Sequence, residues 1–178
     1  WQSLGSAWWH NCSAHARIRT MAHRDGDGFM LCDCGREHWG LHGAAGLLLV
    51  RTDLHPPHVL LQLRAGWTHG GGTWAVPGGA RDSHEDIVTA AIREAREEVG
   101  VDSTRMEVRH VFADDHGSWR YDTVIAFTQD DAGVYAANHE SAETRWVPLD
   151  DVATFDLHPG LGANWPEIAL LVRAELAA

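Results

Sequence analysis

Residues 79–101 constrain the fold of this chain most strongly, because they predict a loop that leads into an amphipathic helix. Ser83 is the expected N-cap, with Asp86 three residues later, and Gly100 stands where a helix usually ends. We therefore predict a helix over residues 84–99.

Apolar and acidic side chains occupy different faces of this predicted helix. The apolar face, at spacings of i, i+4, i+7 and i+11, consists of Val88, Ile92, Ala95 and Val99. The acidic face, at i, i+3 and i+4, consists of Glu94, Glu97 and Glu98. Neighbouring carboxylates repel one another, so this is either a solvated face relieved by Arg93 and Arg96 or a site for a hard divalent cation. Mg2+ prefers such oxygen ligands.

The polar residues of this stretch resemble the Nudix box, G-x5-E-x7-R-E-U-x-E-E-x-G-U, where U is a bulky aliphatic residue. The matching positions are Gly79, Glu85, Arg93, Glu94, Glu97, Glu98, Gly100 and Val101, with Val99 at an unrestricted position between Glu98 and Gly100. The one departure is Ala95, where the box has Leu, Ile or Val, and it leaves every acid in place. Residues 74–78 also resemble the strand and turn that precede the box. The chain thus resembles the Nudix hydrolases, and MutT in particular.

This resemblance implies a metal site for Mg2+ or Mn2+. Glu94, Glu97 and Glu98 would bind the metal, together with the backbone carbonyl of Gly79. Arg93 and Glu85 are expected to orient the helix and its acids rather than to contact the metal.

The general base that activates water differs among Nudix subfamilies, and Glu94 and Glu140 are the first candidates. In MutT-type members a glutamate at a similar distance before a strand Trp joins the metal site, as Glu140 stands before Trp146. Glu143 is a competing candidate from the same segment. The alternative is that Glu140 and Glu143 are both surface acids of a loop.

The segment before the box, GGTWAVPGG, resembles the MutT and 8-oxo-dGTP diphosphatase type more than the ADP-ribose type. Asn164 resembles the Asn of MutT that binds the purine edge, and an amide offers both a donor and an acceptor. Asn164 is alternatively the N-cap of a closing helix that begins after Pro166. Trp74, with Trp119 and Trp165, is a candidate platform for stacking a base, although large aromatic residues more often belong to the core.

The remaining pattern predicts one α/β domain over residues 43–178, preceded by an N-terminal extension over residues 1–42. Apolar runs predict strands over residues 45–51, 59–64, 107–113, 121–129 and 144–149. This order fits the Nudix fold, in which a mixed β-sheet lies between α-helices.

The extension contains all three cysteines of the chain, Cys12, Cys32 and Cys34. An odd number with Cys-x-Cys spacing is not typical of a disulfide framework, so we expect a reducing, cytoplasmic location. A structural Zn2+ at Cys32, Cys34 and His38, with Cys12 or His23 as a further ligand, is one hypothesis. Reduced cysteines in a small turn packed on the domain are the interpretation that we favour.

Charge and hydropathy exclude two classes of partner. Lys and Arg number 14 against 25 Asp and Glu, a net charge of −11, which argues against binding a nucleic-acid polymer. The chain contains no run of about 18 apolar residues, so we predict no membrane-spanning helix. The chain begins with Trp1 rather than Met, so we expect a leader or tag to be missing from the numbering. A monomer or a homodimer fits these features.

Three functional hypotheses follow. The leading one is a Mg2+-dependent pyrophosphohydrolase that cleaves a nucleoside triphosphate, with 8-oxo-dGTP as the example, to the monophosphate and pyrophosphate. The second is a hydrolase of ADP-ribose or of another nucleoside diphosphate derivative. The third is a nucleotide-sensing Nudix module without catalysis, which is disfavoured because all the box acids are present.

Overall fold

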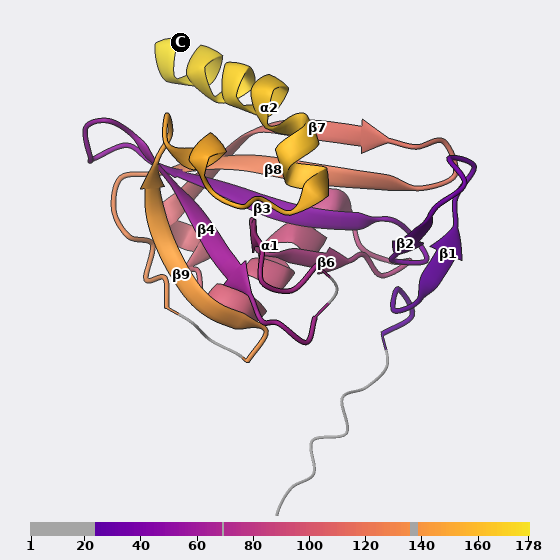
Figure 1. Ribbon diagram of the computed structural model, residues 1–178. Helices are drawn as coiled ribbons and strands as arrows, with labels where there is room; N and C mark the ends of the chain where they lie inside the picture. The colour runs from indigo at the N-terminus through magenta and orange to yellow at the C-terminus, as the bar shows by residue number, and fades with distance from the viewer. Residues whose placement is uncertain (1–23, 69, 136–138) are drawn as a thin grey trace, which may run out of the picture.

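The computed structural model describes residues 24–68, 70–135 and 139–178, and its centre is a mixed sheet with one helix on each face (Figure 1). A separate two-stranded hairpin lies at one end of this sheet. It is formed by β1 (Phe29–Leu31) and β2 (Glu37–Trp39). Cys12 and His23 lie outside the described residues. Within the described part of the chain, no helix is long and apolar enough to cross a membrane.

The central sheet has the strand order β5-β4-β3-β8-β7, with β6 paired to β3 and β9 paired to β4. Its strands are β3 (Ala44–Arg51), β4 (His58–Arg64), β5 (Trp74–Ala75), β6 (Gly78–Ala80), β7 (Met106–Asp115), β8 (Arg120–Thr128) and β9 (Ser141–Pro148). Strands β3 and β8 are parallel, and the other pairs are antiparallel. The predicted mixed sheet between helices is therefore confirmed, and the five strands predicted from apolar runs begin and end within three residues of the observed ones.

The side chains of β3 point alternately to the two faces of the sheet, and this explains why a helix covers each face. Leu48 and Val50 pack in one core cluster with residues of α2 (Pro159–Ala177), whereas Leu47 and Leu49 pack in a second cluster with residues of α1 (Ile87–Val99). Successive side chains of a strand point to opposite faces, so a run of leucines in β3 supplies both cores.

Strands β3 and β4 diverge, and β6 occupies the space that opens between them. The far end of β3 pairs with β4 through Val50 and Arg51, whereas residues 44–46 at its near end pair with β6. Gly46 is required for this close approach, because a Cβ there would lie 2.1 Å from the Tyr121 hydroxyl and 3.0 Å from a methyl of Val76. As a result β6, a short strand that contains Gly78 and Gly79, packs against α1.

Helix α1 starts later than predicted, at Ile87, and the prediction that Ser83 caps it is wrong. Asp86 is the N-cap, and its carboxylate accepts a hydrogen bond from the Thr89 backbone N–H at 2.8 Å. The Ser83 backbone N–H instead donates to Asp25 at 3.0 Å. A turn in which the Glu85 N–H donates to the Asp82 carbonyl holds these preceding residues outside the helix.

Helix α2 starts earlier than predicted. It begins at Pro159, after the N-cap His158, so both the predicted start after Pro166 and the N-cap role of Asn164 are wrong. Proline suits the first turn of a helix, which explains Pro159. Pro166 has no backbone N–H to donate inside the helix, and the buried side chains on both sides of it, including Trp165 and Ile168, hold the helix against the sheet across this position.

The corrected start of α1 gives a direct test. The Asp86→Ala variant should unfold a few degrees below the wild-type protein in a thermal melt, since it removes an N-capping acceptor. The Ser83→Ala variant is the matched control and should shift the midpoint less. A larger loss for Ser83→Ala than for Asp86→Ala would contradict the observed cap.

Candidate active site

Glu98 is a buried carboxylate that lies where the sheet divides. Its side chain is on the inner side of α1, and the residue is only 3% exposed. Oε2 accepts hydrogen bonds from the Gln62 side-chain amide in β4 and from the Gly78 backbone N–H in β6, both at 2.8 Å. Burial raises the pKa of Glu98 to about 7. One carboxylate thus connects the helix to both strands that border the opening.

Gln62 is fixed in the orientation that Glu98 requires. The Ser141 hydroxyl, at the start of β9, lies 2.5 Å from Gln62 Oε1 and donates to it, which turns the amide N–H toward Glu98. Both residues are buried. This pair was not predicted from the sequence, although a polar Gln inside the apolar run of β4 was a signal that could have identified it.

Arg93 orients two other glutamates of the box. Its guanidinium donates to both carboxylate oxygens of Glu85, at 2.6 and 2.7 Å, and to the Ala80 carbonyl at 3.0 Å. It also pairs with Glu94. Burial raises the pKa of Glu94 despite that ion pair, whereas the hydrogen bonds from Arg93 lower the pKa of Glu85. Arg93 thus joins Glu85 and Glu94 to the Ala80 backbone.

Gly79 gives the carboxylate of Glu94 access to the backbone of β6. A Cβ at Gly79 would lie 2.7 Å from the Glu94 carboxyl carbon, so any larger residue would displace that side chain. Two glutamates of α1 thus reach the same short strand, Glu94 beside Gly79 and Glu98 at the Gly78 N–H. Such a donor set fits a hard divalent cation that prefers oxygen ligands.

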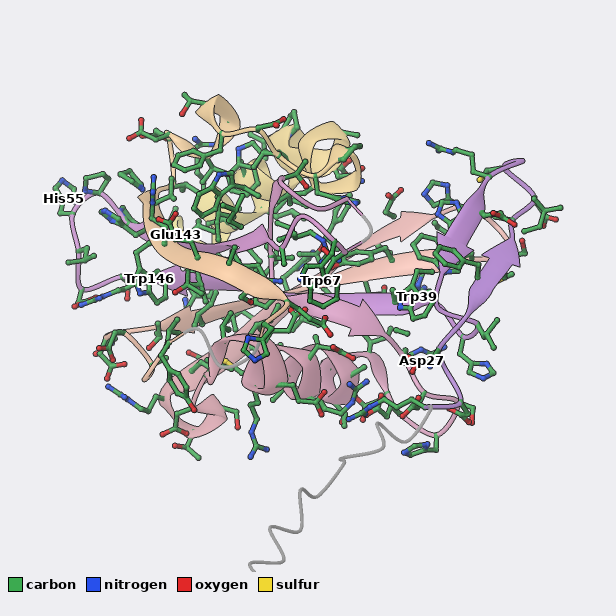
Figure 2. All side chains as sticks on the ribbon, turned by 60° about the horizontal axis from the view of Figure 1, so that its bottom comes forward. Asp27, Trp39, His55, Trp67, Glu143 and Trp146 are labelled. Atoms are coloured by element: carbon green, nitrogen blue, oxygen red, sulfur yellow. The ribbon has the colours of Figure 1, made fainter. Side chains whose placement is uncertain are left out.

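Glu97 lies at the exposed side of this place and pairs with a residue from the N-terminal segment. Arg24 contacts the Glu97 carboxylate at 2.5 Å and Asp82 at 3.5 Å. The backbone N–H of Gly26 donates to Asp82 at 3.0 Å, which holds the segment beside the loop before α1; Figure 2 shows Asp27 in the same region. Arg24 was missed because no pattern in the sequence connects it to the box.

The box acids face protein donors rather than one another. Residues 24–68, 70–135 and 139–178 contain two groups of three side chains that could hold a metal. Within each group, the ligand atoms all lie within 4.8 Å of one another. The groups are Cys32, Cys34 and His38, and Asp25, Asp82 and His84. The carboxylates of Glu94, Glu97 and Glu98 are in neither group, so binding a shared cation requires side-chain rotation toward it.

The two acids of the β9 segment occupy different places. The backbone carbonyl of Glu140 accepts from the Ala65 N–H at 2.8 Å, and the next residue, Ser141, contacts the Glu98 backbone carbonyl at 3.3 Å. Glu143 pairs with Arg145 at 2.5 Å on the surface of β9, where Figure 2 shows it in the same strand as Trp146. The structure therefore brings the backbone around Glu140 close to the end of α1 and places Glu143 in a surface ion pair.

Asn164 lies inside α2, where its amide nitrogen donates to Asp114 in β7 at 2.8 Å and to the Gly160 carbonyl at 3.0 Å. The indole of Trp74 is half-buried on the α2 side of the sheet. Phe155 meets this indole edge-on, with ring centroids 5.3 Å apart, and the Arg145 guanidinium lies 5.0 Å from its centroid.

The other two candidate stacking residues are core residues. Trp119 is 8% exposed and Trp165 is 5% exposed. The Trp119 indole N–H donates to the Gly40 carbonyl at 3.0 Å. Their large apolar surfaces are used in packing, which is the more common role of an aromatic residue.

The raised pKa of Glu98 predicts how stability depends on pH when divalent metal is removed by EDTA. The carboxyl ionises near pH 4.5 when unfolded and near pH 7 when folded, so the unfolded state releases its proton first as pH rises. The free energy of unfolding should therefore fall by about 2 to 3 kcal/mol between pH 4.5 and 7 from this group. Denaturant titrations of wild-type protein and of the neutral isostere Glu98→Gln measure the difference. Parallel pH profiles for the two proteins would contradict the assignment.

Comparison with known proteins places the chain in one family. The NUDIX domain model matches residues 40–166. A Mycobacterium tuberculosis protein named "Putative 8-oxo-dGTP diphosphatase 3" is 48% identical over 155 residues, covering 81% of this chain and 69% of the relative. The crystal structure of RenU, a Nudix hydrolase from M. smegmatis, is 42% identical with a TM-score of 0.77, covering 84% of this chain and 96% of that one.

The name of a further relative gives two activities. It is a nucleoside triphosphate pyrophosphatase/Nudix hydrolase fusion protein of Bifidobacterium longum, 42% identical over 152 residues. The match covers 83% of this chain and 32% of that protein.

Proposed function

This chain belongs to the Nudix hydrolase family, whose members hydrolyse phosphoanhydride bonds, and we propose that it cleaves a nucleoside triphosphate to the monophosphate and pyrophosphate with Mg2+ or Mn2+. An oxidised purine triphosphate such as 8-oxo-dGTP is the proposed substrate. The name of the M. tuberculosis relative and the MutT-like residues before the box support this choice.

The observation that carries the proposal is the buried carboxylate of Glu98 beside Glu94 and the β6 backbone. Burying a carboxylate is costly unless it is paired, and in the described part of the chain the hydrogen bonds to the Glu98 carboxylate come from two neutral donors, Gln62 and Gly78. The raised pKa of Glu98 reflects that incomplete compensation. A divalent cation would complete it.

We assign the proposed ligands from this arrangement. Glu98 and Glu94, with the Gly79 carbonyl and Glu97 at the exposed side, would hold the cation. When bound, the metal neutralises charge on the phosphates and lowers the pKa of a water molecule. Without it, a chain of net charge −11 would repel a triphosphate.

The protein's own residues would position the reacting groups. Arg93 keeps the Glu94 carboxylate in place through the ion pair described above, and Glu94 or Glu140 would accept the proton of the attacking water. Arg24 stands at the exposed side of the site, where its guanidinium would exchange Glu97 for a phosphate oxygen when substrate binds.

Base recognition is proposed for Asn164 and Trp74. Because the amide nitrogen of Asn164 donates to Asp114, the group that it would offer to a purine is its carbonyl oxygen, which accepts a hydrogen bond. Trp74 would stack through the part of its ring that Phe155 and Arg145 leave exposed.

Pyrophosphate and phosphate release, with Mg2+ and with EDTA, tests the proposal. The panel holds canonical dNTPs, 8-oxo-dGTP, ADP-ribose, NADH, diadenosine polyphosphates and nucleotide sugars. We expect Mg2+-dependent release of pyrophosphate from a triphosphate. Glu98→Gln should lower kcat at least about 100-fold, since loss of a metal ligand removes several kcal/mol of transition-state stabilisation.

The matched control is Glu107→Gln, which neutralises an exposed glutamate of β7 that pairs with Arg109. It should hydrolyse the substrate at the wild-type rate. Near wild-type turnover by Glu98→Gln would show that the metal assignment is wrong. Preference for ADP-ribose or a dinucleotide would instead reject the proposed substrate while keeping the site.

A further inference from the structure

The hairpin β1–β2 brings three soft metal ligands together at the end of the molecule that carries Trp39 in Figure 2. We propose that Cys32, Cys34 and His38 form a second metal site, selective for a thiophilic divalent cation such as Zn2+ and independent of the box acids. The spacing of these residues alone favoured reduced cysteines in a turn. Their geometry in the folded hairpin is the new observation.

The ligand atoms already lie near the distances that a tetrahedral site requires. Cys34 Sγ is 3.2 Å from His38 Nε2, and these atoms and Cys32 Sγ all lie within 4.8 Å of one another. Zinc bonds of about 2.3 Å to sulfur and about 2.0 Å to nitrogen place such ligand atoms roughly 3.6 Å apart. Cys34 is exposed, so a small rotation of its side chain can close the remaining distance.

Cys32 and His38 are each held by residues of the turn between β7 and β8. Cys32 is buried, and its thiol donates to the His116 carbonyl at 3.2 Å. The same sulfur accepts from the Cys34 backbone N–H at 3.5 Å and from the Ser118 hydroxyl at 3.7 Å. The His38 ring stacks on Trp119, with centroids 4.1 Å apart and an interplanar angle of 9°. Donors directed at sulfur favour the thiolate, which is the form that binds metal.

The chemistry of this donor set differs from that of the box. Two thiolates and an imidazole are the ligands that Zn2+ prefers, whereas carboxylates and carbonyls suit Mg2+. Three protein ligands leave one position of a tetrahedral zinc site for water. The two sites should therefore fill independently in a mixture of the two metals.

A metal here would stabilise the attachment of the hairpin to the domain. The hairpin is anchored to the turn between β7 and β8, because the Asp33 N–H donates to Ser118 at 3.0 Å and Trp119 donates to the Gly40 carbonyl. Strands of three residues contribute little stability by themselves, so a metal that joins the turn after β1 to His38 in β2 would be a structural support.

Cobalt titration of the full chain tests the proposal. Protein treated with EDTA and a phosphine reductant is desalted and titrated with Co2+ in excess Mg2+. We expect one equivalent to produce a thiolate-to-cobalt charge-transfer band, and Zn2+ to abolish it. Cys34→Ser should weaken Co2+ binding by at least about tenfold. Loss of a residue that only supports a metal ligand already weakens metal binding by about that factor, and Cys34 is proposed as a ligand itself.

Two controls separate this site from the others. Glu98→Gln should retain the full cobalt band although it lacks the proposed ligand of the box. Cys34→Ser should keep the wild-type circular dichroism spectrum, because its side chain is exposed. Absence of a thiolate band, an unchanged band in Cys34→Ser, or loss of the band in Glu98→Gln would overturn the proposal.

Discussion

The carboxylate of Glu98, buried where β3 and β4 diverge, is the interaction on which the rest of this structure depends. Desolvation of a carboxylate is unfavourable, and the hydrogen bonds from Gln62 and Gly78 only partly offset it, as the pKa near 7 indicates. The fold therefore maintains a buried, incompletely compensated carboxylate beside the apolar core under α1. We infer that binding a cation is the reason for retaining it.

Several residues are needed to hold Glu98 and Glu94 against β6. The divergence needs Gly46, where β3 passes the Tyr121 hydroxyl, and the approach of Glu94 to β6 needs Gly79. Ala95 is fully buried against the sheet, so the departure from the box consensus lies inside the α1 core rather than among the acids. The packing of α1 on the sheet and the placement of its buried acid are thus set by neighbouring residues of one helix.

The sequence predicted those parts of the fold that depend on local periodicity. The strands and the acidic helix followed from apolar runs and from the spacing of the box. The N-cap of α1 was predicted wrongly because both Ser83 and Asp86 are good caps, and a tertiary contact with Asp25 decides between them. The start of α2 was missed because Pro166 is tolerated inside a helix whose buried face packs against the sheet.

Only the residues of the candidate site that belong to the box could be predicted from the sequence. The box identified the acids, but Gln62 and Arg24 reach them from other segments, and no local pattern connects such distant residues. The β1–β2 hairpin was not predicted, because strands of three residues with mixed exposure have no clear alternation. Its cysteine and histidine cluster depends on that hairpin.

A crystal structure of the chain grown with Mn2+ and a non-hydrolysable triphosphate tests the central claim most directly. Anomalous scattering locates manganese without reference to activity. The account predicts a peak coordinated by the carboxylate of Glu98, with Glu94 or the Gly79 carbonyl as a further ligand and the phosphates bound at the same ion. Manganese bound elsewhere, with Glu98 still accepting its bonds from Gln62 and Gly78 alone, would contradict it.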